Sequence, residues 1–222
     1  IADQGRENQP RSYGTIANDL DALDKFCRKM VSTASRLYFV YEAGPCGYGI
    51  YRHLTVKGFD CMVAAPSLIP KKSGDRVKTD RRDAAKLASL HRAGELSAVY
   101  VPDPADEAMR DLSRARQDAV NATKKAKQRL KAFLLRNRVV YSGRSVWSQA
   151  YFRWLADITM AYAAQQVALQ EYIDAVKAAS RRVAEISAQM ERVLPQWSMA
   201  PVVDSLVALR GIDKLAAMVL LA

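Results

Sequence analysis

The fold of this chain is decided by two short apolar runs, LYFVYE at residues 37–42 and FDCMVAAP at residues 59–66. Each run predicts a buried β-strand. The residues between them open with a glycine-containing turn and continue into a helical pattern carrying Ile50 and Leu54. Strand, helix and strand in this order indicate an α/β fold whose sheet is at least partly parallel.

Further elements extend this pattern over residues 1–104. Short strands are predicted at residues 13–16 and 99–101. Helices are predicted after Asn18, a residue type that caps helix N-termini, and from Asp80 to about Arg92. Residues 66–78 combine lysines, serine, glycine and proline, which predicts a flexible loop. Residues 1–104 therefore form the first predicted domain.

Residues 105–197 change to long helical patterns. The first helix has an apolar face with several alanines, and the second has apolar residues at alternating steps of three and four, which is a heptad seam. The first face consists of Leu112, Ala115, Ala119, Ala122, Ala126, Leu130 and Phe133, and the seam of Leu169, Tyr172, Val176, Ala179, Val183, Ile186, Met190 and Val193. We expect an all-α antiparallel coiled coil that can pair with a second subunit.

Residues 198–222 have the length and glycine placement of a helix-hairpin-helix, whose backbone N–H groups can bind phosphate. Only Gly211 is present, and Asp213 stands where a second glycine would be. This turn is therefore a poor anion site. The chain begins with Ile1 and ends at Ala222 inside an apolar helical pattern, so both ends are expected to be cut.

Three carboxylates form a candidate metal site. Glu42 closes the first apolar strand, and Asp80 and Asp83 are three residues apart at the start of a predicted helix. A strand tip and one helix face can bring these oxygens to one point, as Mg²⁺ or Mn²⁺ requires. Taken singly, each acid is explained as a helix cap or a first-turn residue that favours the helix dipole. The combination favours the metal site.

Basic residues indicate a polyanionic partner. The formal net charge is +11, and Lys78, Arg81 and Arg82 surround the two aspartates. Between residues 107 and 144 there are eleven Lys and Arg (110, 114, 116, 124, 125, 127, 129, 131, 136, 138 and 144) against three acids (107, 111 and 118). The strongest cluster consists of Lys124, Lys125, Lys127, Arg129 and Lys131. We interpret this helix as a nucleic-acid contact, the alternative being a solvated face.

Aromatic, histidine, glycine and cysteine patterns are less specific. Trp147, Tyr151 and Trp154 could stack on nucleobases, although a core role is the commoner one. The glycines after Glu42 match no nucleotide-binding motif, and His53 and His91 are interpreted as surface residues. Three widely spaced cysteines argue against a disulfide framework and favour a reducing cytoplasm. No apolar run is long enough to span a membrane.

The chain resembles the DEDD transposases of insertion sequences, the IS110 or Piv-type family. The resemblance runs over essentially the whole chain. It rests on EAGPCGYG at residues 42–49, APSLIP at 65–70, KTDRRDA at 78–84, LHRAGEL at 90–96, AMRDL at 108–112 and LRGI at 209–212.

This resemblance implies a RuvC-like, RNase H-type α/β domain with a mixed sheet, then a coiled coil, then a transposase domain carrying a nucleophilic serine. It implies that Glu42, Asp80 and Asp83 are the second, third and fourth metal-binding acids of the family. The first acid falls before Ile1, and Asp3 is not a substitute for it. The serine domain is likewise missing, so we expect these 222 residues by themselves to bind nucleic acid without cutting it.

The resulting hypothesis is a DNA transposase or site-specific recombinase, acting in the bacterial cytoplasm at the nucleoid. Expected partners are DNA, an element-encoded guide RNA as in several family members, and a second copy of the chain through the coiled coil. The first alternative is a non-catalytic basic coiled-coil module that binds nucleic acid. The second is a small-molecule α/β enzyme that uses the glycine turn after Glu42.

Overall fold

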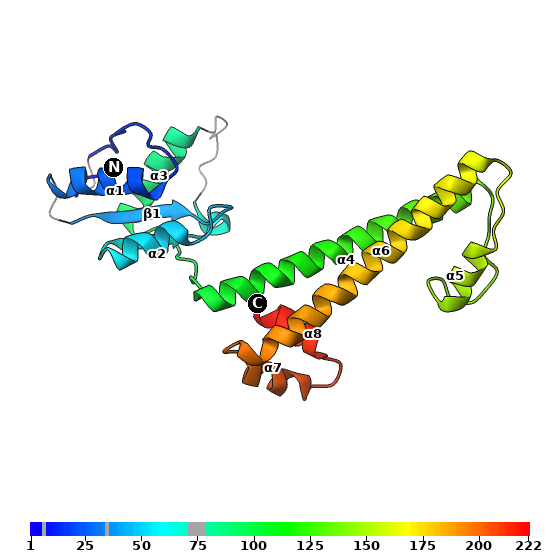
Figure 1. Ribbon diagram of the computed structural model, residues 1–222. Coiled ribbons are helices and arrows are strands. Elements are labelled where there is room, and N and C mark those ends of the chain that lie inside the picture. Colours follow the sequence, from blue (N-terminus) through cyan, green and yellow to red (C-terminus); the bar gives the residue numbers. More distant parts are fainter. Residues whose placement is uncertain (6–7, 34–35, 71–78) are drawn as a thin grey trace. The chain divides into compact units, whose positions relative to one another are not determined.

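The computed structural model describes residues 1–5, 8–33, 36–70 and 79–222, and it divides into two compact units, residues 1–101 and 102–222 (Figure 1). Unit 1 contains α1 (Leu20–Val31), β1 (Tyr38–Glu42), α2 (Gly49–Val56), β2 (Asp60–Ala64), the 3₁₀ turn η1 (Pro66–Leu68) and α3 (Asp80–Ala93). β1 and β2 pair in parallel, with Glu42 opposite Ala64. The predicted strand–helix–strand unit is confirmed.

Local chemistry sets the ends of the helices in unit 1. The carboxylate of Asp19 accepts a hydrogen bond from the backbone N–H of Ala22 at 2.7 Å, so α1 is capped one residue later than predicted from Asn18. Thr79 caps α3 in the same way, and Gly94 ends it in the left-handed conformation (φ 72°) that glycine adopts without strain. The predicted helix from Asp80 to about Arg92 is confirmed.

Two predicted strands are wrong. Residues 13–16 form no strand, and Tyr13 and Ile16 are about half exposed. Residues 99–101 form none either, although Ala98 makes a single antiparallel bridge with Ala64 just before them. β1 itself is exposed or partly buried along its whole length. The expectation of a buried β1 is wrong because, within the described residues, only β2 pairs with it.

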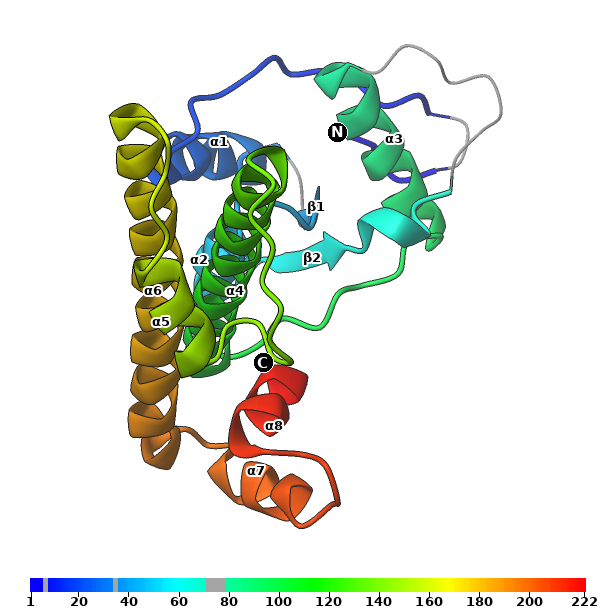
Figure 2. The ribbon, with the colours of Figure 1, turned by 90° about the vertical axis from the view of Figure 1, so that its right-hand side faces the viewer.

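Unit 2 is entirely helical. It contains α4 (Pro104–Arg136), α5 (Gln149–Ala156), α6 (Ala163–Val193), the 3₁₀ turn η2 (Leu194–Gln196), α7 (Ala200–Val207) and α8 (Lys214–Leu221). α4 and α6 lie side by side in opposite directions (Figure 1). α7 and α8 pack together beside the end of α6 (Figure 2). The sequence therefore correctly predicted two long antiparallel helices followed by two short ones.

Two hydrophobic cores hold the hairpin, one toward each end. One surrounds the fully buried Leu130, Leu155 and Val176, and the other joins Met190 to Trp197 and Met218. Between Met109 and Ala126, α4 buries only Ala119. The predicted apolar face is therefore partly exposed at its centre, where small alanine side chains leave open grooves between α4 and α6.

None of the helices in the described residues is long and apolar enough to cross a membrane.

Candidate functional site

The three predicted metal ligands lie on two packed elements of unit 1. Glu42 is the last residue of β1, Asp80 is the first residue of α3, and Asp83 follows one turn later. Glu42 and Asp80 are exposed, and Asp83 is partly buried. Among the described residues, none donates a hydrogen bond to these carboxylates and none pairs with them as a cation. All three carboxylates therefore have oxygens available to an external ligand.

The direction in which α3 runs along β1 decides where Asp80 and Asp83 lie with respect to Glu42. The rings of Tyr38 and His91 lie 6.4 Å apart between centroids, which joins the start of β1 to the last turn of α3. α3 runs back along β1 in the opposite sense (Figure 1). From Tyr38 to Glu42, β1 extends about 13 Å. From His91 back to Asp80, α3 extends about 16 Å. The first turn of α3, with Asp80 and Asp83, therefore lies toward the Glu42 end of β1.

The donor chemistry fits a divalent cation, but a complete site is not assembled. Unpaired carboxylates are the ligands that Mg²⁺ and Mn²⁺ prefer. However, within the described ranges no three His, Cys, Asp or Glu side chains lie close enough together to hold a metal ion. Glu42, Asp80 and Asp83 thus share one end of unit 1 without forming a preformed cluster.

Of the three basic residues predicted to surround the two aspartates, two lie within the described residues. Arg81 and Arg82 are exposed in the first turn of α3, beside the two aspartates. Lys78 lies outside the described residues. Asp3 makes an exposed ion pair with Arg11 through one oxygen of its carboxylate.

A polar cluster that the sequence did not predict joins α1 to α2. Nε2 of His53 lies 2.7 Å from Oδ1 of Asp24, and Lys57 pairs with the other oxygen of the same carboxylate. These hydrogen bonds, first that of Lys57 and then that of His53, lower the pKa of Asp24. The interpretation of His53 as a surface residue is wrong. The partners are 29 positions apart in the sequence, so sequence reasoning could not pair them.

The cysteines are free, as predicted, and Cys27 and Cys61 are poor nucleophiles. Burial raises the pKa of the Cys61 thiol to about 11 and also raises that of Cys27. Because the thiolate is the reactive form, neither residue is activated at neutral pH.

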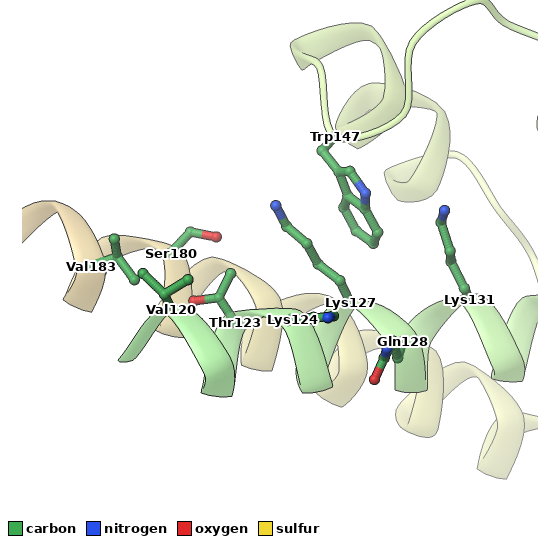
Figure 3. A pocket seen from close by; sticks show the side chains of 9 residues that line it. All are labelled: Val120, Thr123, Lys124, Lys127, Gln128, Lys131, Trp147, Ser180 and Val183. Carbon is green, nitrogen blue, oxygen red and sulfur yellow. The ribbon is translucent and has the colours of Figure 1, made fainter. Parts of the chain in front are cut away.

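In unit 2, a groove of about 600 Å³ runs between α4 and α6 and reaches the loop before α5. Lys124, Lys127 and Lys131 line it from α4 and Trp147 lines it from the loop, while Ser180 and Val183 lie on α6. Lys127 and Lys131 rise on either side of the indole ring (Figure 3), with Nζ atoms 5.1 and 5.9 Å from the ring centroid. The groove therefore combines an aromatic face with three cations.

The helical repeat groups four cations of α4 on one face, which Asp106 in the first turn of the helix shares. At 3.6 residues per turn, Arg116 and the three groove lysines fall within about 80° of one another. The three acids that the sequence places between residues 107 and 144 fall together about 160° away from the centre of that group. Lys125 and Arg129 lie with these acids, as do Arg114 and Arg136, so that face carries charges of both signs. Sequence reasoning missed Arg116, which the same periodicity would have grouped with the lysines.

The structure also separates the three predicted stacking aromatics. Tyr151 is 2% exposed and belongs to the core, and Trp154 packs against it with ring centroids 5.4 Å apart. Trp147 contacts that core through Tyr151 and also lines the groove. Of the three, Trp147 is the one available for stacking in the groove.

The turn between α7 and α8 is occupied by its own cap. The carboxylate of Asp213 accepts a hydrogen bond from the N–H of Ala216 at 2.7 Å. A negative charge already lies at this helix N-terminus, so the expected weakness of the turn as a phosphate site has a physical cause.

Comparison with known proteins places the chain among transposases. Residues 3–137 match the family described as the IS110-type DEDD transposase. The chain is 44% identical over 217 residues to y4qE of Sinorhizobium fredii, a protein classed by name among transposases. It is 30% identical over 201 residues to the transposase for insertion sequence element IS1533 of Leptospira borgpetersenii.

These alignments include 98% and 90% of the chain but 52% and 58% of the respective relatives. The chain thus spans about half the length of the curated relatives it matches. Because the family match includes more than half of the chain, the chain belongs to the IS110 family of insertion-sequence transposases. The resemblance seen in the sequence is confirmed.

Proposed function

We propose that this chain takes part in DNA transposition, with unit 1 as a RuvC-like metal-binding domain. Glu42, Asp80 and Asp83 would hold one or more Mg²⁺ or Mn²⁺ ions. Such an ion, when bound, stabilises negative charge on a phosphodiester during strand cleavage and transfer. The chain's own contribution is to leave these carboxylates without a partner among the described residues and to present Arg81 and Arg82 beside Asp80 and Asp83 for phosphate.

One observation carries this proposal. Within the family-matched residues 3–137, the strand β1 and the helix α3 pack together, and they carry at one end of unit 1 three acids whose carboxylates have no partner among the described residues. An acid that served only as a helix cap would bond to backbone N–H groups, as Asp19 and Asp103 do. Glu42, Asp80 and Asp83 make no such bond to any described residue, which favours a ligand outside the chain.

Titration with Mn²⁺, followed by electron paramagnetic resonance, tests this proposal. Glu42→Gln and Asp80→Asn should each weaken binding at least about tenfold, since even outer-shell changes cost about 10–100-fold in metal affinity. Glu95→Gln removes an exposed acid just after α3 and should have no effect. Equal Mn²⁺ affinity in all three variants would refute the metal site.

The nucleic acid is proposed to lie along the basic face of α4. Arg116, Lys124, Lys127 and Lys131 offer four cations on one face of α4. Asp106 shares this face in the first turn and accepts a hydrogen bond from the indole N–H of Trp197. When Lys and Arg neutralise the phosphates of a nucleic acid, the binding affinity falls steeply as the salt concentration rises. DNA is the proposed substrate, and an element-encoded guide RNA is a second polyanion that the same face would accept.

Self-association through the hairpin is also proposed, with α4 and α6 forming a coiled coil. The support is the exposure of large apolar side chains on its helices and loops, including Leu135 (76%) and Val167 (64%). Light scattering should give the mass of a dimer. Leu135→Lys with Val167→Lys should shift that mass toward the monomer, and an unchanged mass would rule out this surface.

A second candidate function is a nucleic-acid-binding module without catalysis. It is favoured by the absence of an assembled three-ligand group in the described residues. It predicts salt-sensitive nucleic-acid binding with no Mn²⁺ binding, so the same titration separates the two candidates. Both candidate functions use the basic face of α4 to bind nucleic acid. They differ in whether unit 1 binds a metal ion.

A further inference from the structure

The groove between α4 and α6 has the parts of a site for one unpaired nucleotide strand. Its floor carries Val120 and Val183 with the hydroxyls of Thr123 and Ser180, and its far end is the indole of Trp147 (Figure 3). Its volume of about 600 Å³ lies within the range of ligand-sized pockets. A long open trough between helices suits an extended chain better than a compact ligand.

The cations are arranged around this trough rather than scattered over the helix. Lys124, Lys127 and Lys131 all border the groove, and Arg116 continues the same face, where its Nε donates to Oγ of Ser187 at 2.8 Å. No acid lines the groove. The charge is therefore complementary to a phosphate backbone that follows α4.

The hydrophobic core of unit 2 fixes the position of the Trp147 ring. Its ring contacts Tyr151 edge-on with centroids 5.1 Å apart, and Tyr151 is buried in the core. The backbone at Trp147 is left-handed (φ 66°), a conformation that costs energy in a residue other than glycine. Within the described residues, the indole N–H has no hydrogen-bond partner. A strained, anchored aromatic that borders an open groove fits a stacking platform.

We propose that the groove binds an unpaired nucleic-acid strand, one base stacking on Trp147 while Lys124, Lys127 and Lys131 contact the flanking phosphates. Stacking requires a base whose face is free, and the bases of an intact duplex have both faces covered. The proposal rests on the proposed function only in taking nucleic acid as the ligand. It requires no metal.

Photocrosslinking of the full chain tests the proposal without a variant. A 12-nucleotide strand containing 5-iodouracil is irradiated with the protein in EDTA, as DNA and as RNA, and the adduct is located by mass spectrometry. The expected adduct is on Trp147, and the arm that gives it identifies the nucleic acid. Adducts confined to other residues, such as the 71% exposed Tyr162, would overturn the proposal.

Affinity measurements give an independent test. Loss of one stacked base corresponds to about a 5- to 150-fold loss, so Trp147→Leu should weaken single-strand binding by that factor. Trp147→Phe, which keeps an aromatic face, should lose less, and duplex binding should not change. Tyr162→Leu is the matched control at an exposed aromatic. Equal losses for strand and duplex, or none, would contradict stacking at Trp147.

Salt dependence tests the lysines separately. Replacing Lys124, Lys127 and Lys131 by Gln should reduce the slope of log K against log salt by about 2 for a single strand. Lys125→Gln with Arg129→Gln, on the opposite face, should leave strand binding in this groove nearly unchanged. Equal effects of the two sets would show a diffuse charge effect. Because these measurements exclude metal, their failure would leave the Mn²⁺ result of unit 1 intact.

Discussion

Unit 1 and unit 2 differ in how much hydrophobic core and how many polar contacts stabilise them. Among the described residues, unit 1 buries five hydrophobic side chains and unit 2 buries seventeen. Unit 1 relies visibly on polar links, such as Asp24 with His53 and Lys57, and Arg92 with the backbone carbonyls of Asp3 and Asn8. The unit with the candidate metal ligands therefore has the smaller core, and the unit with the basic groove has the larger.

The largest effect is expected in the core of unit 2. Leu130 is fully buried in α4, so Leu130→Ala should lower the free energy of unfolding by about 2–5 kcal/mol. Leu135→Ala, at a 76% exposed position on the same helix, should change it by less than about 0.5 kcal/mol. Urea denaturation followed by circular dichroism measures both. Similar values for the two variants would contradict the described packing of α4.

The next effect concerns the loop that carries Trp147. A Cβ at Gly143 would clash with the Tyr141 ring, whose centroid lies 4.9 Å from those of Tyr151 and Trp154. Gly143→Ala should therefore destabilise unit 2 by about 1–3 kcal/mol through overpacking. Gly49→Ala is the matched change in unit 1, where an added Cβ meets no described atom within 4 Å beyond its chain neighbours and its own helix backbone, so it should be close to neutral. A neutral Gly143→Ala would mean that the Tyr141 ring is free to move.

A smaller, pH-dependent effect is expected in unit 1. Hydrogen bonds from Lys57 and His53 lower the pKa of Asp24 below its ordinary 3.8. The stability that this carboxylate contributes is therefore present above about pH 3.8 and is lost as the pH falls through the lower folded pKa. The hydrogen-exchange protection factors of α1 and α2 should fall over that range, and in Asp24→Asn they should be lower already at pH 7. Asp21→Asn, at an exposed acid of α1, is the control.

Sequence patterns predicted the helices of both units better than the strands. A helix satisfies its own backbone hydrogen bonds, so periodicity and caps located α3, α4 and α6 closely. A strand needs a neighbour. The apolar residues at 13–16 and 99–101 resemble strands, but the described structure provides no partner for the first and only one bridge before the second.

The candidate sites show the same limit. The three acids were found from their residue types and spacing, yet their distances depend on how α3 packs on β1. The lysines of the groove were also found from sequence. Trp147 could not be assigned to them because a loop with left-handed backbone at Arg138 and Trp147 brings it back onto α4. Lys125 and Arg129 were grouped with the lysines by sequence proximity, whereas the helical repeat places them on another face.

The central claim is that the two units divide the work, with metal bound by unit 1 and a nucleic-acid strand bound by unit 2. The most direct test measures Mn²⁺ affinity and single-strand affinity, the latter in EDTA, on the same two variants. Asp80→Asn should weaken Mn²⁺ binding at least about tenfold and leave strand binding unchanged. The Lys124, Lys127 and Lys131 to Gln variant should do the reverse. If either variant changed both affinities, or if Asp80→Asn changed neither, the division would be contradicted.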